Sequence, residues 1–536
     1  MSASSATRGV ADERLKRTAQ VIVWAASVCF LITFAFNSLT RRDTFSDPDT
    51  MNFVDVARNI ATGRGLTQSA LGFNQPRFAL DETIPAPFTS QPPLYPLLVA
   101  LLIWAGAPAA PAALTVSVLA FGLGLWAAYQ LGQELYDGTT ATLGLLLLLF
   151  YNPLYQMANT AFSEATGLLF VLLSLWLLAR GARGRAEQPW LRAAAGVCAG
   201  LAFATRYALL PLAAVGLVAI VLEPGARRRG LAVFAVGFLI PAGLVLGHNW
   251  AASGALMPSP NPSNVGLAAN LAATFSAIFG MYWAPERLGA VGQMVLVLAA
   301  LALVVAWLAA RQRLPATARE VFVARGRYLL PLWCLAYLAF LVYQRTLTHF
   351  DNINPRLVLP ASAVLLLMLA ALLTHTFRVR REWVLGLAAA GALLVLVREV
   401  QFSARTAPLD RLAPIARSTA LSWIATETTP RDLIVGLNAS YVPYYFGPRA
   451  AVSFSPYPYT DNLDYDHLMA YDRLHCGEYA RVFLVLPEPD SFSASDWQAN
   501  FGPFVANLAA GQWRRYAGIE LLESLRDGSV FAIHCD

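Results

Sequence analysis

The chain has 536 residues, of which 57% are hydrophobic and only 13% are charged, and its mean hydropathy is +0.50. About a quarter of the residues in a soluble domain are charged, so this composition excludes an ordinary soluble protein and predicts a polytopic α-helical membrane protein. The net charge of +6 does not indicate nucleic-acid binding, because the arginines form short clusters between apolar segments, as in the cytoplasmic loops of membrane proteins.

The N-terminal segment predicts a retained first membrane helix. Residues 1–18 are polar and are expected to form a disordered cytoplasmic tail, and the apolar run 19–39 is long enough to span a bilayer. Arg14, Lys16 and Arg17 precede this run, and no clear small-residue cleavage site follows it. We therefore interpret the run as a spanning helix that starts in the cytoplasm, and not as a cleaved signal peptide.

A polar loop follows at 40–93, and two carboxylates near its start, Asp47 and Asp49, flank a proline. The next residues, MNFVDVARNIATGRG, show the periodicity of an amphipathic helix that ends at Gly63 and Gly65. Two interpretations stay open on spacing alone. The acids cap the helix in a solvated loop, or they act as a general base or bind a divalent cation.

The flanking charges order the other apolar segments. The run Leu94–Gly106 has about 13 residues, which suits an interfacial or re-entrant helix better than a span. If it does not span, the basic cluster Arg180–Arg185 falls in the cytoplasm, as the positive-inside rule requires. Further spans are expected near 112–132, 141–156, 162–180, 191–205, 207–222, 230–250, 290–310, 328–345, 357–376 and 383–400. With the first helix they make about 11 spans and place the C-terminus outside the cytoplasm.

From 403 to 536 the composition becomes that of a soluble domain, so the membrane domain is expected to cover 19–402. Strands are predicted at 433–437, 481–487 and 529–534, and helices at 410–427, 462–475 and 495–509. This alternation indicates a small extracytoplasmic α/β domain. If its compartment is oxidising, Cys476 and Cys535 are candidates for a disulfide.

The predicted topology gathers several polar residues on the outer face. Glu164 begins an apolar helix, where it serves either in catalysis or as a favourable charge at a helix N-terminus. Arg206 and Arg356 lie at apolar helix ends, where arginine either binds a phosphate or extends to the interface. His248 fits a structural role, and the loop with Asn249 fits a turn or a pocket wall. Their convergence predicts a site that holds a lipid phosphate beside a carboxylate base.

The order of these elements resembles the GT-C superfamily of polyprenyl-phosphate-sugar glycosyltransferases. It is most similar to the bacterial relatives of protein O-mannosyltransferases and to the lipid A aminoarabinose transferases. The matching elements are DPDTMNFVDVARNIATGRG, QPPLYPLL, FSEATGLLFVLLSL, ATRY, HNWAASG and NPRLVLP. The resemblance covers about residues 20–400. The order of the elements is fairly specific, although no single motif is.

The resemblance implies a catalytic carboxylate in the first outer loop, and Asp49 is its best match. The family's usual neighbouring acid falls on Pro48, and Asp47 lies one position further away, so the role of Asp47 and metal binding by this pair stay open. Glu164 matches a second acidic position, and Arg356 matches a late arginine near the lipid phosphate. Arg206 is assigned to the same phosphate. The substrate pocket is expected to include Asp47, Pro92, Tyr95 and Asn249.

The resemblance further implies an inverting transfer in which Asp49 takes the acceptor's proton. The donor would be a polyprenyl-phosphate sugar, and the acceptor an extracytoplasmic protein, lipid or cell-envelope glycan. The protein would be a multi-pass component of the bacterial inner membrane with a cytoplasmic N-terminus. The sequence leaves open which sugar and acceptor are used, whether a divalent cation takes part, and the oligomeric state.

Two alternatives to a glycosyltransferase make different demands on the sequence. A transporter or flippase of a lipid-linked or anionic substrate would place charges along a path at the membrane midplane, in broken helices of two related halves. The sequence shows no such repeat, and its charges gather at one face. A polysaccharide polymerase or ligase would need a large outer loop, and the loop 251–289 is short for that role.

Overall fold

The structure of the chain is a computed structural model. It describes residues 3–42, 47–72, 84–183, 188–222, 227–257, 262–263, 265–279, 326–348, 350–376, 381–410, 415, 417–437, 439–454, 465–475, 477–487 and 503–534. The chain divides into two compact units. The helical unit comprises Met1–Arg42, Leu114–His248 and Asn261–Ala407. The α/β unit comprises Asp43–Ala113, Asn249–Pro260 and Pro408–Asp536. The first outer loop therefore groups with the C-terminal residues.

The described part of the helical unit consists of apolar helices. They are α1 (Ala3–Thr40), α4 (Ala109–Leu135), α5 (Gly138–Leu149), α6 (Asn152–Asn159), α7 (Glu164–Arg183), α8 (Pro189–Thr205), η1 (Tyr207–Leu209), α9 (Pro211–Leu222), α10 (Arg227–Ser253), α11 (Leu267–Phe279), α14 (Leu329–Leu347), α15 (Pro355–Ala371), η3 (Leu372–Thr376) and α16 (Arg381–Arg405). Helix α1 already begins at Ala3, so the tail predicted to be disordered continues the first helix, because extending a formed helix is inexpensive.

Seven helices in the described part of the chain are long and apolar enough to cross a membrane. The pair α5 and α6, which meets at a bend of 59°, raises the number to eight if it forms one broken span. Helices α8 and α9 are shorter, and the span expected at 290–310 lies outside the described residues. The polytopic helical architecture is therefore confirmed, and the total of about 11 spans stays a prediction.

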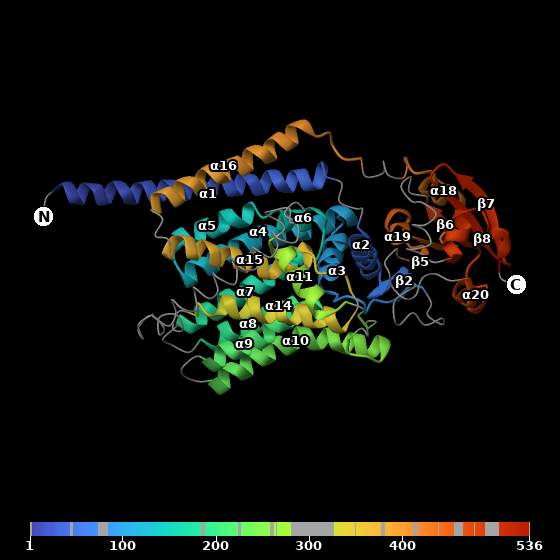
Figure 1. Ribbon diagram of the computed structural model, residues 1–536, viewed down its shortest axis with the longest axis horizontal. Helices are drawn as coiled ribbons and strands as arrows, with labels where there is room; N and C mark the ends of the chain where they lie inside the picture. The colour runs from blue at the N-terminus through green and yellow to red at the C-terminus, as the bar shows by residue number, and fades with distance from the viewer. Residues whose placement is uncertain are drawn as a thin grey trace. The chain divides into compact units, whose positions relative to one another are not determined.

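Close packing of helices in this unit depends on small residues. Helices α1 and α16 lie side by side (Figure 1), and α7 packs along α8. Where α8 meets α10, a Cβ atom on Gly196 would lie 2.2 Å from the carbonyl oxygen of Phe234. The same atom on Gly200 would lie 2.6 Å from the carbonyl oxygen of Phe238. Two glycines one turn apart thus let these backbones approach, as in many membrane helix pairs.

The α/β unit is built on a six-stranded sheet with strand order β2-β5-β4-β6-β8-β7. The strands are β2 (Ala70–Gly72), β5 (Ala450–Phe454), β4 (Leu433–Leu437), β6 (Val482–Pro487), β8 (Gly528–Ile533) and β7 (Ile519–Leu525). The first four are mutually parallel, and β8 and β7 complete the sheet antiparallel. The sequence predicted β4, β6 and β8. It did not predict β2, β5 or β7.

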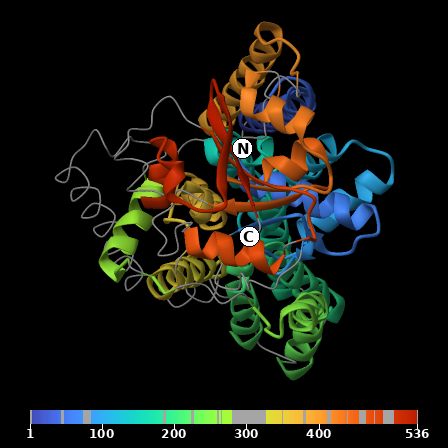
Figure 2. The same cartoon turned by 90° about the vertical axis from the view of Figure 1, so that its right-hand side faces the viewer.

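Helices cover both faces of this sheet, and Figure 2 looks onto the unit from the side of its red strands. Helices α18 (Thr419–Glu427) and α19 (Tyr441–Phe446) share one apolar cluster with the strands. Helix α20 (Tyr465–Leu474) and residues 503–509 share the other. Such a three-layer arrangement buries each helix on its apolar side. Cys476 and Cys535 lie outside the described residues, so the predicted disulfide remains a prediction.

The first outer loop contributes two helices and small strands to the same unit. Helix α2 (Pro48–Ala61) buries Phe53, Val54 and Val56, and α3 (Leu94–Trp104) packs against it. Helix α3 has 11 residues, in agreement with the short helix predicted there. Strands β1 (Thr67–Gln68) and β3 (Ala86–Pro87) pair antiparallel beside them.

Candidate active site

A buried ion cluster lies in the helical unit around Glu164. This residue begins α7 and is only 2% exposed. Its Oε1 atom accepts a hydrogen bond of 2.7 Å from Nη1 of Arg206 and a second hydrogen bond from Nε of Arg356. The sequence placed these three residues on one face, and the structure brings them into direct contact.

Each arginine is presented by the end of a helix. Arg206 follows α8 in an extended conformation, and Arg356 is the second residue of α15. Arg206 also donates from Nη1 to Oγ of Ser163 at 3.2 Å. The guanidinium of Arg356 lies over the ring of Phe162, with 4.1 Å from Cζ to the ring centroid. Residues 162–164 therefore orient both guanidinium groups.

The charge balance of the cluster favours an anion. These three side chains comprise two guanidinium groups and one carboxylate, so hydrogen-bond donors predominate in the cluster. The N-terminus of α7 adds the positive end of a helix dipole. Arginine binds phosphate oxygens with paired, charge-assisted hydrogen bonds. The cluster is thus suited to stabilise a phosphate group.

The second carboxylate oxygen of Glu164 is available for a further contact. Oε2 is buried, and it has no hydrogen-bond partner among the described residues. A buried acceptor without a donor costs free energy, and such atoms often meet a ligand or a water molecule. Glu164 therefore combines an arginine-orienting oxygen with an oxygen that can accept from a bound hydroxyl.

A strained turn leads into Glu164. Helix α6 ends at Asn159, and the backbone N–H of Phe162 donates to the carbonyl of Met157 at 3.3 Å. Between them Ala161 has φ of +54°, in the left-handed region that glycine usually occupies at a helix C-terminus. Ser117 on α4 donates from Oγ to the carbonyl of Phe162 at 3.1 Å. These contacts fix the direction in which α7 starts.

The sequence did not predict a second buried carboxylate in this unit, Glu399 on α16. Its Oε1 accepts from Nδ2 of Asn37 at 2.8 Å and from Arg42, and its Oε2 accepts from the hydroxyl of Tyr155 at 2.8 Å. These bonds join α16 to α1 and α6. The sequence could have indicated Glu399, because an acidic residue inside an apolar span requires a partner or a function.

The α/β unit holds the paired acids of the first outer loop. Asp47 is the N-cap of α2 and accepts from the backbone N–H of Asp49 at 2.9 Å. Asp49 lies in the first turn, where its Oδ1 accepts from Nε2 of Gln91 at 3.3 Å. Gln91 belongs to the QPPLYPLL element, although sequence reasoning did not single it out. The structure thus gives Asp47 the capping role and leaves Asp49 half-buried beside an amide.

The other residues predicted for the substrate pocket have internal partners. The hydroxyl of Tyr95 donates to the carbonyl of Ala113 at 2.9 Å, and the residue is fully buried. Pro92 is also buried. Asn249 donates from Nδ2 to the carbonyl of Leu256 at 2.9 Å. These contacts show how the three residues stabilise the α/β unit, and their role in a pocket stays a prediction.

A divalent cation needs more ligands than the predicted pair supplies. The described residues contain no group of three or more His, Cys, Asp or Glu side chains arranged to hold a metal ion. Asp47 already uses one oxygen as a helix cap. Mg²⁺ and Ca²⁺ prefer six or more oxygen ligands, so the described residues alone do not form a complete site.

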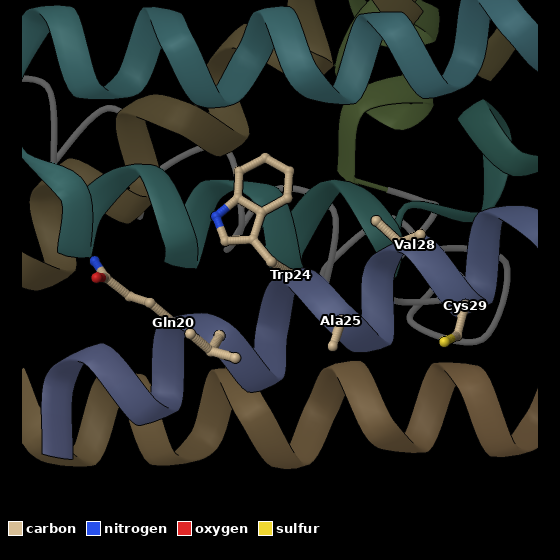
Figure 3. A pocket seen from close by; sticks show the side chains of 6 residues that line it. Gln20, Trp24, Ala25, Val28 and Cys29 are labelled. Atoms are coloured by element: carbon tan, nitrogen blue, oxygen red, sulfur yellow. The ribbon is translucent and has the colours of Figure 1, made fainter. Parts of the chain in front are cut away.

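Helix α1 lines an apolar groove that is separate from the ion cluster. Figure 3 shows its lining, which comes from residues 20–29. Trp24 extends from α1 to α4, where its ring meets the ring of Tyr129 edge-on at 4.7 Å between centroids. Such a predominantly apolar surface on a spanning helix is suited to hydrocarbon chains.

Known proteins resemble the chain both in fold and in sequence. The structure matches that of ArnT from Cupriavidus metallidurans in the apo state with a TM-score of 0.55 and 13% identity, over 96% of this chain and 97% of that one. ArnT bound to undecaprenyl phosphate gives a TM-score of 0.52 and 14% identity over the same shares. The apo oligosaccharyltransferase of Archaeoglobus fulgidus gives 0.52 and 13%, over 96% of this chain and 74% of that one.

The chain thus has the fold of the GT-C membrane glycosyltransferases. Within that class, residues 90–246 match the family model described as dolichyl-phosphate-mannose-protein mannosyltransferase. No curated protein sequence matches the chain. The fold and the family match agree with the GT-C resemblance that the order of the motifs predicted.

Proposed function

We propose that the protein moves a sugar from a polyprenyl-phosphate donor to an extracytoplasmic acceptor, with inversion at the anomeric carbon. The observation that carries this proposal is the buried cluster of Glu164 with Arg206 and Arg356, because it provides fixed cations for a phosphate leaving group. It is supported by the relative ArnT, which was solved with undecaprenyl phosphate bound. The acceptor is a hydroxyl or amine of a protein, lipid or cell-envelope glycan.

The proposed reaction is a single displacement. The acceptor atom loses its proton to a carboxylate and attacks the anomeric carbon, and the bond from that carbon to the phosphate oxygen breaks. Polyprenyl phosphate then leaves with one more negative charge on its terminal oxygens. Arg206 and Arg356 stabilise this developing charge, which is where preorganised cations contribute most to the rate.

Asp49 is the proposed general base. It is half-buried in the first turn of α2, and Asp47 caps that turn through the backbone N–H of Asp49. Gln91 donates to Oδ1 of Asp49 at 3.3 Å and so helps to fix the orientation of this carboxylate. A carboxylate held by neighbouring hydrogen bonds has the fixed geometry that proton transfer needs.

Glu164 takes a different role from Asp49 in this mechanism. Its Oε1 already accepts hydrogen bonds from both arginines, so this oxygen serves to hold the two guanidinium groups in place. We assign Glu164 to the orientation of the two guanidinium groups, and its Oε2 to a hydroxyl of the bound donor. The protein acts in the bacterial inner membrane, with its N-terminus in the cytoplasm and its α/β unit on the opposite side.

The test uses purified protein in nanodiscs with a panel of radiolabelled polyprenyl-phosphate sugars. Wild type is expected to release polyprenyl phosphate and to pass the label to an acceptor or to water. Asp49→Asn should lower kcat by about a thousandfold or more at normal folding, because a general base and its positioning are both removed. Arg356→Lys should lower kcat less than Asp49→Asn does, because lysine keeps the positive charge and loses only the planar geometry of arginine.

Two results would overturn the proposal. Turnover by Asp49→Asn at the wild-type rate would move the base to another residue. Absence of turnover and of binding with every donor, in protein that is folded and monodisperse, would leave only the shared fold.

A further inference from the structure

Helix α2 is connected to the sheet of the α/β unit through its middle turns. Asp55, which is 1% exposed, accepts a hydrogen bond of 2.6 Å from the backbone N–H of Ser69. Asn59 donates from Nδ2 to the carbonyl of Thr67 at 3.1 Å and to Oγ of Ser69 at 3.1 Å. Asp55 and Asn59 lie one turn apart on α2. One face of this helix is therefore hydrogen-bonded to the segment that leads into β2.

Strand β2 in turn belongs to the sheet of the C-terminal region. It pairs parallel with β5, with Leu71 opposite Val452, and the backbone N–H of Ala451 donates to the carbonyl of Ser69 at 2.9 Å. Ser69 therefore contacts α2 through its N–H and β5 through its carbonyl. A parallel pair between segments almost 400 residues apart in sequence makes the first outer loop and the C-terminal strands one folded element.

Arg58 in the last turn of α2 provides a second connection. Its Nη1 donates to the carbonyls of Pro443 at 2.9 Å and Tyr444 at 2.5 Å, and its guanidinium lies 5.6 Å from the centroid of the Tyr444 ring. Both carbonyls belong to α19, whose last carbonyls have no helical partner. The charged, planar guanidinium group of arginine can donate to two such carbonyls at once. The contact therefore depends on the geometry of the arginine side chain.

We propose that Arg58 is a positioning residue, through which the C-terminal domain sets the direction of α2 and thereby the place of the Asp49 carboxylate. The inference rests on the proposed function of Asp49. The two residues are nine apart on one helix, so about 13 Å of rigid helix separates them. A tilt of about 5° at Arg58 therefore moves Asp49 by about 1 Å, a displacement large enough to slow a reaction about a hundredfold.

The test compares two arginines that donate to backbone carbonyls in the same unit. Arg58→Met removes the contact between α2 and α19. Arg449→Met is the matched control, because Arg449 donates to the carbonyl of Ile424 at 3.0 Å and to Oγ1 of Thr428 at 2.6 Å, and neither of these acceptors belongs to α2. Both are assayed for kcat and donor KM per folded molecule, and for hydrogen–deuterium exchange of the α2 amides.

Arg58→Met is expected to lower kcat at least about tenfold with little change in donor KM, and to speed exchange over residues 48–61. Arg58→Lys should recover part of the rate, since it keeps one donor to a carbonyl. Arg449→Met should lower the unfolding temperature and keep kcat. Equal loss of kcat in both variants, or wild-type kcat and exchange in Arg58→Met, would overturn the proposal.

A cross-link separates this inference from the proposed function. Leu71→Cys with Val452→Cys joins β2 to β5 at paired positions. If the C-terminal domain is a fixed support, the oxidised double variant forms the intramolecular disulfide and keeps the turnover of its reduced form. Loss of turnover on oxidation that a reductant restores would show that the loop must leave the sheet, which contradicts the proposal. Disulfide formation and amide exchange can be measured even if the protein accepts no sugar donor. Failure of the positioning role of Arg58 is therefore distinguishable from failure of the proposed transferase function.

Discussion

Glu164 and Arg206 form a partly buried ion pair of 2.7 Å between Oε1 and Nη1, and Arg356 shares the same oxygen atom. One carboxylate oxygen thus accepts hydrogen bonds from two guanidinium groups at the ends of different helices. Removing one partner of a buried pair leaves an uncompensated charge, which is far more costly than the pair is stabilising. The same geometry makes Glu164 the residue on which the orientation of both arginines depends.

Glu164→Gln keeps the size of the side chain and removes its charge. We expect a loss of about 3 kcal/mol in the free energy of unfolding, because two partly buried cations lose their buried counterion. We also expect kcat to fall at least about a hundredfold, with no rise in donor KM, since the extra positive charge still attracts the phosphate. Chemical unfolding in detergent and steady-state kinetics measure both effects.

Glu520→Gln serves as the control for this substitution. Glu520 pairs with His534 at 3.0 Å, but both side chains are more than half exposed. Exposed pairs contribute about 0–1 kcal/mol, so stability and kcat should stay near wild type. If Glu164→Gln behaves like this control, the ion cluster has neither of the roles assigned to it.

Tyr155→Phe tests the network around Glu399. The substitution removes only the hydroxyl that donates to Oε2 of Glu399 at 2.8 Å. A hydrogen bond to a charged group contributes about 1.5–3 kcal/mol, and stability should fall by that amount while kcat per folded molecule stays unchanged. In a double-mutant cycle with Asn37→Ala, which removes the donor to Oε1, the losses should not be additive. Additive losses would show that the two donors act on separate structural elements.

Ala161→Gly tests the strain before Glu164. Glycine adopts the observed φ of +54° without the clash of a Cβ atom, so relief of strain should raise stability by about 1 kcal/mol. Thermal unfolding in nanodiscs measures the change. Ala158→Gly, one turn earlier in α6, is the matched comparison. It should lower stability by at least about 1 kcal/mol, because glycine is a poorer helix former and a buried methyl group is lost. A loss of the same size at both positions would mean that the methyl group of Ala161 contributes more by packing than it costs in strain.

Asp55 gives the α/β unit a pH dependence with an unusual sign. Burial of the charged form raises the pKa of Asp55 from 3.8 to about 6, even though Ser69 donates to it. The native state therefore binds the proton more tightly than the unfolded state. The protonated Asp55 carboxyl stabilises the fold fully below pH 3.8, and this stabilisation is lost as the pH rises to about 6. The free energy of unfolding changes by about 3 kcal/mol over that range.

Asp55→Asn should remove this dependence and be more stable than wild type at pH 7.5. The measurement is the unfolding midpoint of both proteins between pH 4 and pH 8. Asp432→Asn is the control of opposite sign. Burial alone would raise the pKa of Asp432, but the hydrogen bonds from Arg481 and Thr429 hold it below its ordinary value, so Asp432 stabilises the protein as the pH rises. A wild-type pH profile in Asp55→Asn would contradict the role assigned to the buried carboxyl.

The membrane helices and part of the site were predictable from local sequence. Apolar length and basic flanks predicted α4, α7, α14 and α15 within a few residues, because each helix satisfies its own backbone hydrogen bonds. The polar residues at the ends of these helices, Glu164, Arg206 and Arg356, were recognisable for the same reason. An ionisable residue at the end of an apolar helix is costly unless it is used or paired.

Contacts between distant segments were beyond such reasoning. Strand β2 has three residues and no strand signal of its own, and it exists because β5 supplies its hydrogen bonds. The buried state of Asp55 and the carbonyl contacts of Arg58 depend on the same pairing. Local residue types thus determined that this chain has membrane-spanning helices, resembles the GT-C glycosyltransferases and carries acids and arginines at its helix ends. Only the tertiary structure decided which arginines share Glu164 and which strand supports Asp49, because those contacts arise between residues that the chain order keeps far apart.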